Sequence, residues 1–240
     1  MLGLGNNVSD SARSWTPADL PSLKVWYKFN QGLESDDGIF PANNEEIEVW
    51  RDQSGQGNDA TATNDEVTYA LEEKAPFFLT NTAGFTFPKQ QIAAGSLFFR
   101  IKFQTGQNID SGDILADSAS TSDFIKIQSN SGAGEIRWKV DGANKKFAPA
   151  ELFVVDEKYN LCFDRDNSGV FSAFMTRVGA PQTLVAMTKT SAADSAITNL
   201  YTLNTLFGGN DMFFYEVLMF SSSLHPTDRN KLNEYLNSEN

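Results

Sequence analysis

The chain has 240 residues, of which 40% are hydrophobic and 12% aromatic, and its formal net charge at pH 7 is −12. This apolar content is enough for a packed core and excludes global disorder, while the length suits a single all-β domain. The acidic charge repels phosphate backbones, so we expect no nucleic-acid partner. No segment approaches the roughly 18 apolar residues that a membrane helix needs, so we expect no membrane insertion.

Residues 1–20 are rich in Gly, Asn, Ser and Asp and show neither a helical nor a strand period. They predict an extended N-terminal arm, followed by one domain over residues 21–240. The first residues lack the basic and apolar segments of a secretory signal, so no signal peptide is expected. The single cysteine, Cys162, lies in an apolar run, which predicts a small buried side chain.

Short alternating segments separated by Gly, Asn and Asp turns predict an all-β fold. In the first segment, residues 23–29, apolar side chains alternate with Lys24, Trp26 and Lys28. A short helix is predicted at residues 227–236, behind a Ser or Thr cap. The strands predicted after the first are residues 47–52, 76–79, 84–87, 96–103, 124–128, 135–140, 159–163, 170–175 and 212–220.

The segment after the second predicted strand is a candidate metal or structural loop. Residues 53–59 contain two glycines within three positions, which predicts a tight turn. We expect Asp52 and Asn58 to hold this loop by side-chain to backbone hydrogen bonds. The alternative is a Ca²⁺ site with Asp52, Asn58 or Asp59 as ligands, because calcium prefers several oxygen donors. No other cofactor is expected.

Tryptophan side chains are the candidates for stacking against sugar rings. Trp50 and Trp138 alternate with charged neighbours in a way that predicts core positions. Trp26 shares a strand face with two lysines and Trp15 lies in the arm, so we expect both to be exposed. Exposed aromatic side chains mark ligand or protein contacts, which makes Trp26 and Trp15 the predicted ligand-binding residues.

No catalytic residues are predicted. Glycoside hydrolases with sandwich folds place carboxylates at alternating positions of one strand, and no Glu-x-Asp-x-x-Glu segment or close variant is present. The nearest pair, Glu46 and Glu48, lacks a third acid. His225 is the only histidine, so the usual zinc ligand set is missing. Residues 164–169 are similar to half a calcium loop, but a methionine replaces the bidentate Glu and a tight hairpin is expected.

Three segments resemble the concanavalin A-like lectin/glucanase and laminin G-like superfamily. Residues 49–60 are similar to its W-x-D-x-S-G-x-G-N-x-A loop, residues 207–210 to its glycine-rich turn, and residues 215–229 to its closing strand and helix. The resemblance spans residues 22–240. It implies a two-sheet jelly-roll sandwich with a short C-terminal helix, a fold that serves lectins, hydrolases and structural modules alike.

The N-terminus resembles virion structural proteins of tailed phages that infect marine cyanobacteria, in the start Met-Leu-Gly-Leu-Gly-Asn and the strand Leu-x-x-Trp-Tyr-Lys-Phe-Asn at residues 23–30. This resemblance implies a non-enzymatic virion protein, a capsid decoration, fibre, or tail or neck appendage. It implies a homo-oligomeric or lattice-bound subunit whose arm docks to other virion proteins through Leu2, Leu4 and Trp15. Adhesion to host-surface polysaccharide is compatible with that role. The alternatives are a free carbohydrate-binding module and a glycoside hydrolase.

Overall fold

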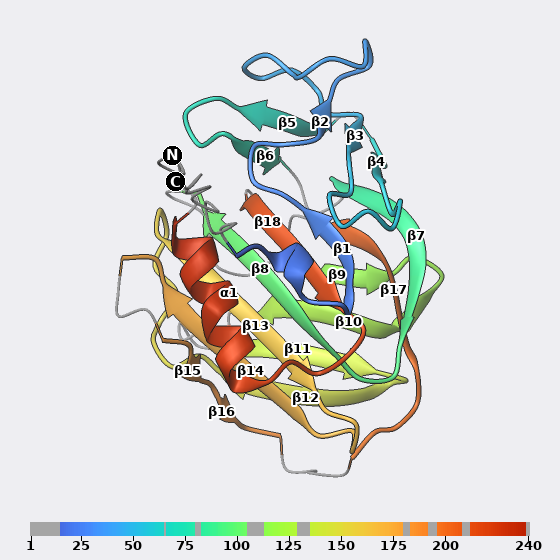
Figure 1. Cartoon of the computed structure of the whole chain (residues 1–240), viewed down its shortest axis with the longest axis vertical. Helices are drawn as coiled ribbons and strands as arrows, with labels where there is room; N and C mark the ends of the chain where they lie inside the picture. Colours follow the sequence, from blue (N-terminus) through green and yellow to red (C-terminus); the bar gives the residue numbers. More distant parts are fainter. Residues whose placement is uncertain are drawn as a thin grey trace, which may run out of the picture.

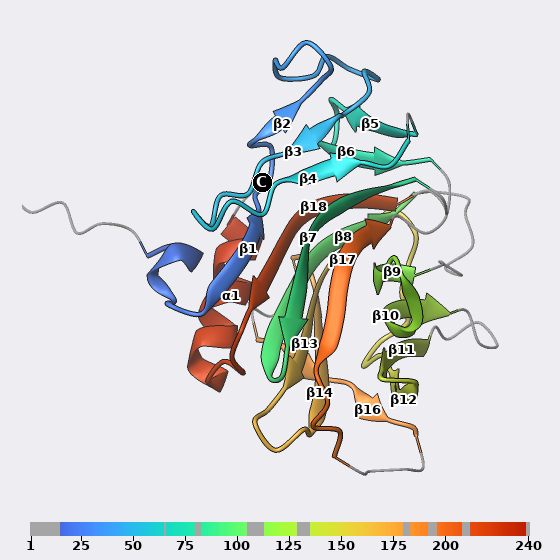
Figure 2. The ribbon, with the colours of Figure 1, turned by 90° about the vertical axis from the view of Figure 1, so that its right-hand side faces the viewer.

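The computed structural model describes residues 15–64, 66–79, 83–104, 113–128, 135–179, 183–191, 196–207 and 212–238. They form two antiparallel sheets packed face to face, with one C-terminal helix on the outer side of the first sheet (Figures 1 and 2). This confirms the predicted all-β sandwich. Of the helices in the described ranges, none has the length and apolar character needed to cross a membrane.

The first sheet, sheet A, has the strand order β15-β14-β13-β8-β18-β6-β5, and β1 pairs with β18. Its strands are β1 (Leu23–Tyr27), β5 (Val67–Ala70), β6 (Ala75–Phe78), β8 (Gly95–Phe103), β13 (Lys158–Arg165), β14 (Phe171–Arg177), β15 (Val185–Ala186) and β18 (Met212–Phe220). The chain therefore brings its first long strand and its last strand together, as jelly rolls do.

The second sheet, sheet B, has the order β16-β12-β11-β10-β9-β17-β7-β4-β3-β2. Its strands are β2 (Leu33–Glu34), β3 (Val49–Trp50), β4 (Ala60–Ala62), β7 (Gly84–Ile92), β9 (Asp113–Asp117), β10 (Ser120–Gln128), β11 (Glu135–Val140), β12 (Ala143–Ala148), β16 (Thr188–Lys189) and β17 (Tyr201–Phe207). The predicted strands at residues 124–128 and 135–140 form the hairpin of β10 and β11, and the hairpin expected around residues 164–169 is that of β13 and β14.

The core fills the space between the two sheets and is rich in aromatic rings. Trp50 and Trp138 are 0% and 1% exposed, as predicted from their alternation with charged neighbours. Trp138 packs edge-on against Phe163, Phe171 and Tyr201, with ring centroids 5.8, 4.7 and 5.7 Å away. Edge-to-face packing of this kind adds to the stability that burial alone provides.

Helix α1 (Pro226–Ser238) lies across the outer face of sheet A (Figure 1). Leu232 and Leu236 are fully buried in a cluster with Phe98 and Leu218 of the sheet. Arg100 Nη1 donates to the backbone oxygen of Leu236 at 2.5 Å, which satisfies a carbonyl at the helix end. The core covers the inner face of sheet A, and α1 lies on the outer face. Every residue of β8 and β18 is buried.

The described end of the predicted arm packs on the domain. Residues Pro17–Asp19 form a 3-10 turn, η1, closed by a hydrogen bond of 2.8 Å from the Thr16 nitrogen to Asp19 Oδ2. The Trp15 ring meets Tyr235 of α1 edge-on, with centroids 6.5 Å apart. The last residues of the predicted arm, from Trp15 onward, therefore pack on the domain, because α1 offers them an apolar face. The boundary of the arm at residue 20 stays a prediction.

Candidate functional site

The predicted loop at residues 52–59 is held by its own side chains. Asp52 Oδ1 accepts the backbone N–H groups of Trp26 and Ser54, both at 2.9 Å, and its Oδ2 accepts that of Asn58 at 3.0 Å. Asn58 Nδ2 donates to the Lys24 carbonyl at 2.8 Å. The expected side-chain to backbone bonds are confirmed, and they join the loop to β1.

The second aspartate of this loop has protein partners on both oxygens. Asp59 Oδ1 accepts the Asp52 N–H at 2.8 Å, and Oδ2 pairs with Arg51 Nη1 at 2.7 Å. A calcium ion at Asp52, Asn58 and Asp59 would have to displace these donors, so the arrangement does not favour one. No group of three or more acidic, His or Cys ligands occurs among the described residues. Calcium binding stays a prediction, tested by comparing the melting temperature in calcium and in a chelator.

Trp26 is not exposed, and the expectation that it offers an open face is wrong. Its side chain is 6% exposed, its indole N–H donates to Glu216 Oε1 at 2.6 Å, and its ring meets Tyr235 edge-on at 6.1 Å. The physical reason is that α1 and η1 cover the outer face of sheet A around Trp26, which the core leaves open. A ligand cannot stack on Trp26 without moving the helix.

Trp15 is half-buried, and it borders a shallow pocket of about 390 Å³ on α1 that Lys231, Glu234 and Tyr235 also line. Trp15 therefore stays a predicted ligand-binding residue, because its side chain lines a pocket. Leu2 and Leu4, predicted to dock to a partner with Trp15, lie outside the described residues.

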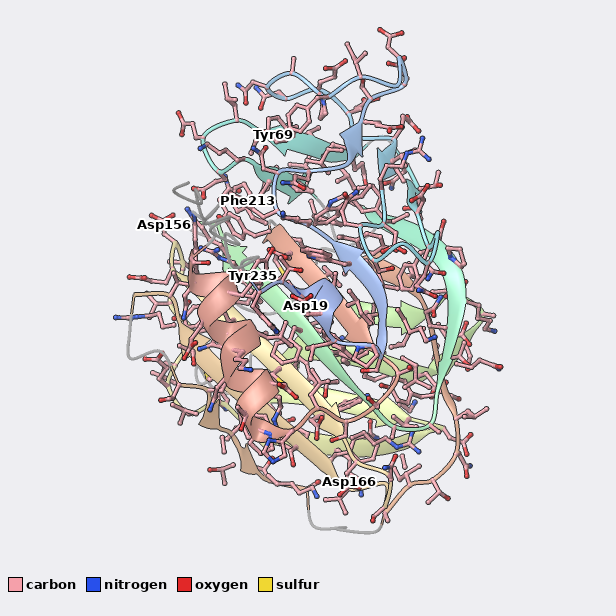
Figure 3. The ribbon with its side chains drawn as sticks, in the orientation of Figure 1. Asp19, Tyr69, Asp156, Asp166, Phe213 and Tyr235 are labelled. Atoms are coloured by element: carbon pink, nitrogen blue, oxygen red, sulfur yellow. The ribbon has the colours of Figure 1, made fainter. Side chains whose placement is uncertain are left out.

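A different pocket, of about 380 Å³, is lined by charged side chains from one end of sheet A. It lies on the outer face of the sheet beyond the C-terminal end of α1, where Asp156 and Phe213 come together (Figure 3). The β5–β6 turn, the loop before β13, and strands β8 and β18 surround it. We call it the Glu73 pocket, and its polar and aromatic lining includes Asn43, Asn44, Glu73, Lys102, Asp156 and Phe213.

The floor of the Glu73 pocket follows the register of the sheet. Lys158 on β13, Lys102 on β8 and Phe213 on β18 are register neighbours across three adjacent strands, so their side chains share the outer face. Phe213 continues the row to Phe77 on β6, with ring centroids 4.8 Å apart. Lys102 Nζ lies 5.5 Å from the Phe213 centroid, within cation–π range. The row places two ammonium groups beside an aromatic surface.

Glu73 reaches over this row and bridges both lysines. Its Oε1 lies 2.7 Å from Lys102 Nζ and its Oε2 3.2 Å from Lys158 Nζ, while the Tyr215 hydroxyl also donates to Oε2. Burial alone would raise the pKa of Glu73, but the hydrogen bonds from Lys102 and Tyr215 and the charges of both lysines outweigh it and lower the pKa to about 2. Glu73 is therefore a fixed carboxylate at neutral pH.

Lys102 is held between two carboxylates. Its Nζ lies 2.5 Å from Asp156 Oδ1, besides its contact with Glu73. Burial would lower the pKa of this ammonium, but its hydrogen bonds to Asp156 and Glu73 and their charges raise it. The Asp156 side chain is 61% exposed, and Asn43 and Asn44 are exposed beside it. Fixed charges, amides and an aromatic ring are the groups that orient a polar ligand in a pocket.

The Glu73 pocket was not among the predicted sites, although the sequence contains one indication of it. Lys102 follows Arg100 in a strand that is otherwise apolar from Leu97 to Phe103. Charged side chains at alternating positions of such a strand need partners, but only the folded chain shows that Glu73 supplies one of them.

The turn at residues 164–169 is a tight hairpin turn as predicted, with Asp166 Oδ1 accepting the N–H groups of Ser168 and Val170.

No protein-family model matches the chain, and no curated protein matches it. Among solved structures, domain 4 of a GH43 extracellular arabinanase from Geobacillus stearothermophilus, in complex with arabinotriose, matches with a TM-score of 0.60 and 14% identity over 88% of this chain and 98% of that chain. The ligand-binding domain of botulinum neurotoxin serotype D, in complex with N-acetylneuraminic acid, matches with a TM-score of 0.59 and 13% identity over 89% of this chain and 51% of that chain.

A mutant of Trypanosoma rangeli sialidase displaying trans-sialidase activity matches with a TM-score of 0.55 and 11% identity over 88% of this chain and 32% of that chain. The chain thus spans about half of the neurotoxin domain and nearly all of the arabinanase domain. At these identities the similarity concerns the fold, a sandwich of the kind found in lectin-like domains.

Proposed function

We propose that this protein is a glycan-binding module and that the Glu73 pocket is its binding site. The observation that carries the proposal is the convergence of Glu73, Lys102 and Asp156 beside the Phe213 ring in one open pocket of about 380 Å³. Three separate segments supply the three charged groups, and the ion pairs hold these groups in place before any ligand arrives. Preorganised polar groups of this kind bind with little loss of side-chain entropy.

The chemistry of the pocket suits a sugar. Carboxylate oxygens accept hydrogen bonds from hydroxyl groups, and the Lys102 ammonium and the amides of Asn43 and Asn44 donate to them. The exposed side chain of Leu71 provides an apolar side for the C–H face of a ring. The arabinotriose and N-acetylneuraminic acid complexes of the similar folds support this ligand class.

Binding without hydrolysis is part of the proposal. A glycosidase needs one carboxyl group that stays protonated near neutral pH to donate to the leaving oxygen. The pKa of Glu73 is lowered to about 2, so this carboxyl cannot act as that acid. The pocket therefore favours a lectin-like role over a catalytic one.

The test is a glycan array followed by calorimetry on the full chain. Asp156→Asn removes the charge at the pocket mouth and keeps a residue that tolerates the positive φ of 67° at this position. Asp141→Asn is the matched control, because Asp141 has a φ of 46° in an exposed turn of sheet B. We expect about tenfold weaker binding for Asp156→Asn and no change for Asp141→Asn. Equal affinity of all three proteins for every glycan bound would refute this site.

A second proposal places this module on a virion. The resemblance of the N-terminus and of residues 23–30 to cyanophage structural proteins supports it, and Trp15 would then join Leu2 and Leu4 in docking to a neighbouring virion protein or a second copy. The proposed role is a capsid decoration, fibre, or tail or neck appendage that adheres to host-surface polysaccharide. Immunogold electron microscopy with antibody against residues 22–240 tests it, and unlabelled particles would contradict it.

A further inference from the structure

Three strands of sheet B carry a row of cations on their outer face. Lys126 on β10, Arg137 on β11 and Lys146 on β12 are register neighbours, and we call them the cation row. Asp113 is the register neighbour of Lys126 on β9. Ile136, the alternate residue on β11, is fully buried, so the row faces away from the core. In Figure 2 these strands form the right-hand side of the molecule, opposite α1.

Register pairing of like charges is unfavourable, since cations directly opposite each other repel. Two members of the cation row have close partners on the same face: Arg137 Nε donates to Asn144 Oδ1 at 2.6 Å, and Lys146 Nζ lies 3.0 Å from Glu135 Oε1. Asn144 is neutral, and Glu135 carries one negative charge. A net positive surface thus remains on these strands in a chain whose formal net charge is −12.

Phe124 positions the cations on this face. Its ring lies below both Arg137 and Lys139, each 5.4 Å from the centroid, and only 8% of the residue is exposed. Lys139 Nζ also donates to the Thr121 carbonyl at 2.8 Å. Contact with the ring restrains both side chains and keeps their charged ends at the surface.

We infer that the outer face of β10, β11 and β12 binds an anionic glycan through its sulfate or carboxylate groups. Neighbouring strands lie ~4.8 Å apart, so the cation row spans roughly 10 Å and can meet anionic groups on successive sugars. The Arg137 guanidinium offers paired N–H donors to such oxygens, which an ammonium cannot do. This surface lies on the opposite sheet from the Glu73 pocket and does not rest on the function proposed for that pocket.

The covered ring of Phe124 favours a glycan over a nucleic acid. The net charge of −12 opposes both kinds of polyanion, so charge alone does not distinguish them. Single strands are bound with the help of exposed aromatic rings that stack on bases. Phe124 is covered by Arg137 and Lys139, so the face offers charge without a stacking platform.

Dextran sulfate and unsulfated dextran are the probes, because they share one backbone and differ only in charge. We expect the full chain to bind dextran sulfate and not dextran, with affinity that falls as salt rises. Lys126→Gln combined with Arg137→Gln should weaken binding by at least about tenfold. Lys24→Gln combined with Arg177→Gln removes the same charge from β1 and β14 of sheet A and should leave the affinity within about twofold.

The outcomes separate this surface from the other site. Failure of the wild type to bind dextran sulfate, or an equal loss in both double variants, would overturn the inference. Tighter binding to a single-stranded oligonucleotide, with the same loss in the cation-row variant, would assign a nucleic-acid ligand and overturn it as well. Asp156→Asn should keep full affinity for dextran sulfate, and circular dichroism of each variant confirms its fold.

Discussion

The Oδ1 atom of Asp52 accepts a hydrogen bond from the backbone N–H of Trp26, 2.9 Å away and 26 positions earlier in the chain. With its bonds to Ser54 and Asn58, this carboxylate fastens the glycine-containing loop to β1. We expect Asp52→Ala to lower the free energy of unfolding by about 2–4 kcal/mol, because several part-buried N–H groups lose their acceptor.

Urea unfolding followed by circular dichroism measures this change. The matched control is Asp36→Ala, since Asp36 is an exposed aspartate in a loop of the same half of the chain. It should change the free energy of unfolding by less than about 0.5 kcal/mol. Similar losses in the two variants would show that the loop bonds do not stabilise the fold.

Glu73 makes stability depend on pH at the acid end. Its pKa is about 2 in the folded chain against an ordinary 4.5, so its contribution is complete above pH 4.5 and disappears as the pH falls towards 2. We expect Glu73→Gln to cost about 2 kcal/mol at pH 7, less than the full linkage value because solvent screens the exposed part of the carboxylate. Unfolding curves at several pH values should show the difference from wild type shrinking below pH 4.5. A difference independent of pH would contradict the ion-pair origin.

The hairpin of β10 and β11 shows what alternation in the sequence can predict. Ile136 and Trp138 are buried and Arg137 points outward, as the period of two requires. The bonds of Asp52 to Ser54 and Asn58 within the loop followed in the same way from short-range chemistry. Local pattern was sufficient because neighbouring residues decide these features.

Trp26 and Glu73 illustrate features that the alternation of apolar residues in the sequence cannot predict. Alternation correctly placed Trp26 on the face opposite the core, but it could not reveal that α1, about 200 residues later in the chain, covers that face. Glu73 meets Lys102 across 29 positions, and this contact depends on the order of strands in sheet A. The Glu73 pocket is therefore a property of the topology.

Cys162 should be inert in the folded chain. The residue is fully buried, and burial raises the pKa of its thiol well above the ordinary value, with the nearby Asp164 charge adding to the effect. We expect reaction with a thiol reagent at neutral pH to proceed at under roughly 1% of the rate in denaturant, because the thiolate is the reactive form. Rapid labelling under native conditions would mean that the β13 region opens readily.

Gly169 and Gly55 distinguish two reasons for a glycine, which are a positive φ and close contact with neighbouring backbone. Both have positive φ, 78° and 79°, but a Cβ on Gly169 would lie 2.4 Å from the Ile197 carbonyl oxygen, whereas one on Gly55 meets nothing within 4 Å. Gly55→Ala should therefore lower the free energy of unfolding by about 1 kcal/mol, the conformational cost alone. Gly169→Ala should lower it by roughly 3 kcal/mol or more, since the backbone at Ile197 must also move. Equal losses in urea unfolding would mean that the segment at Ile197 does not pack on the β13–β14 turn.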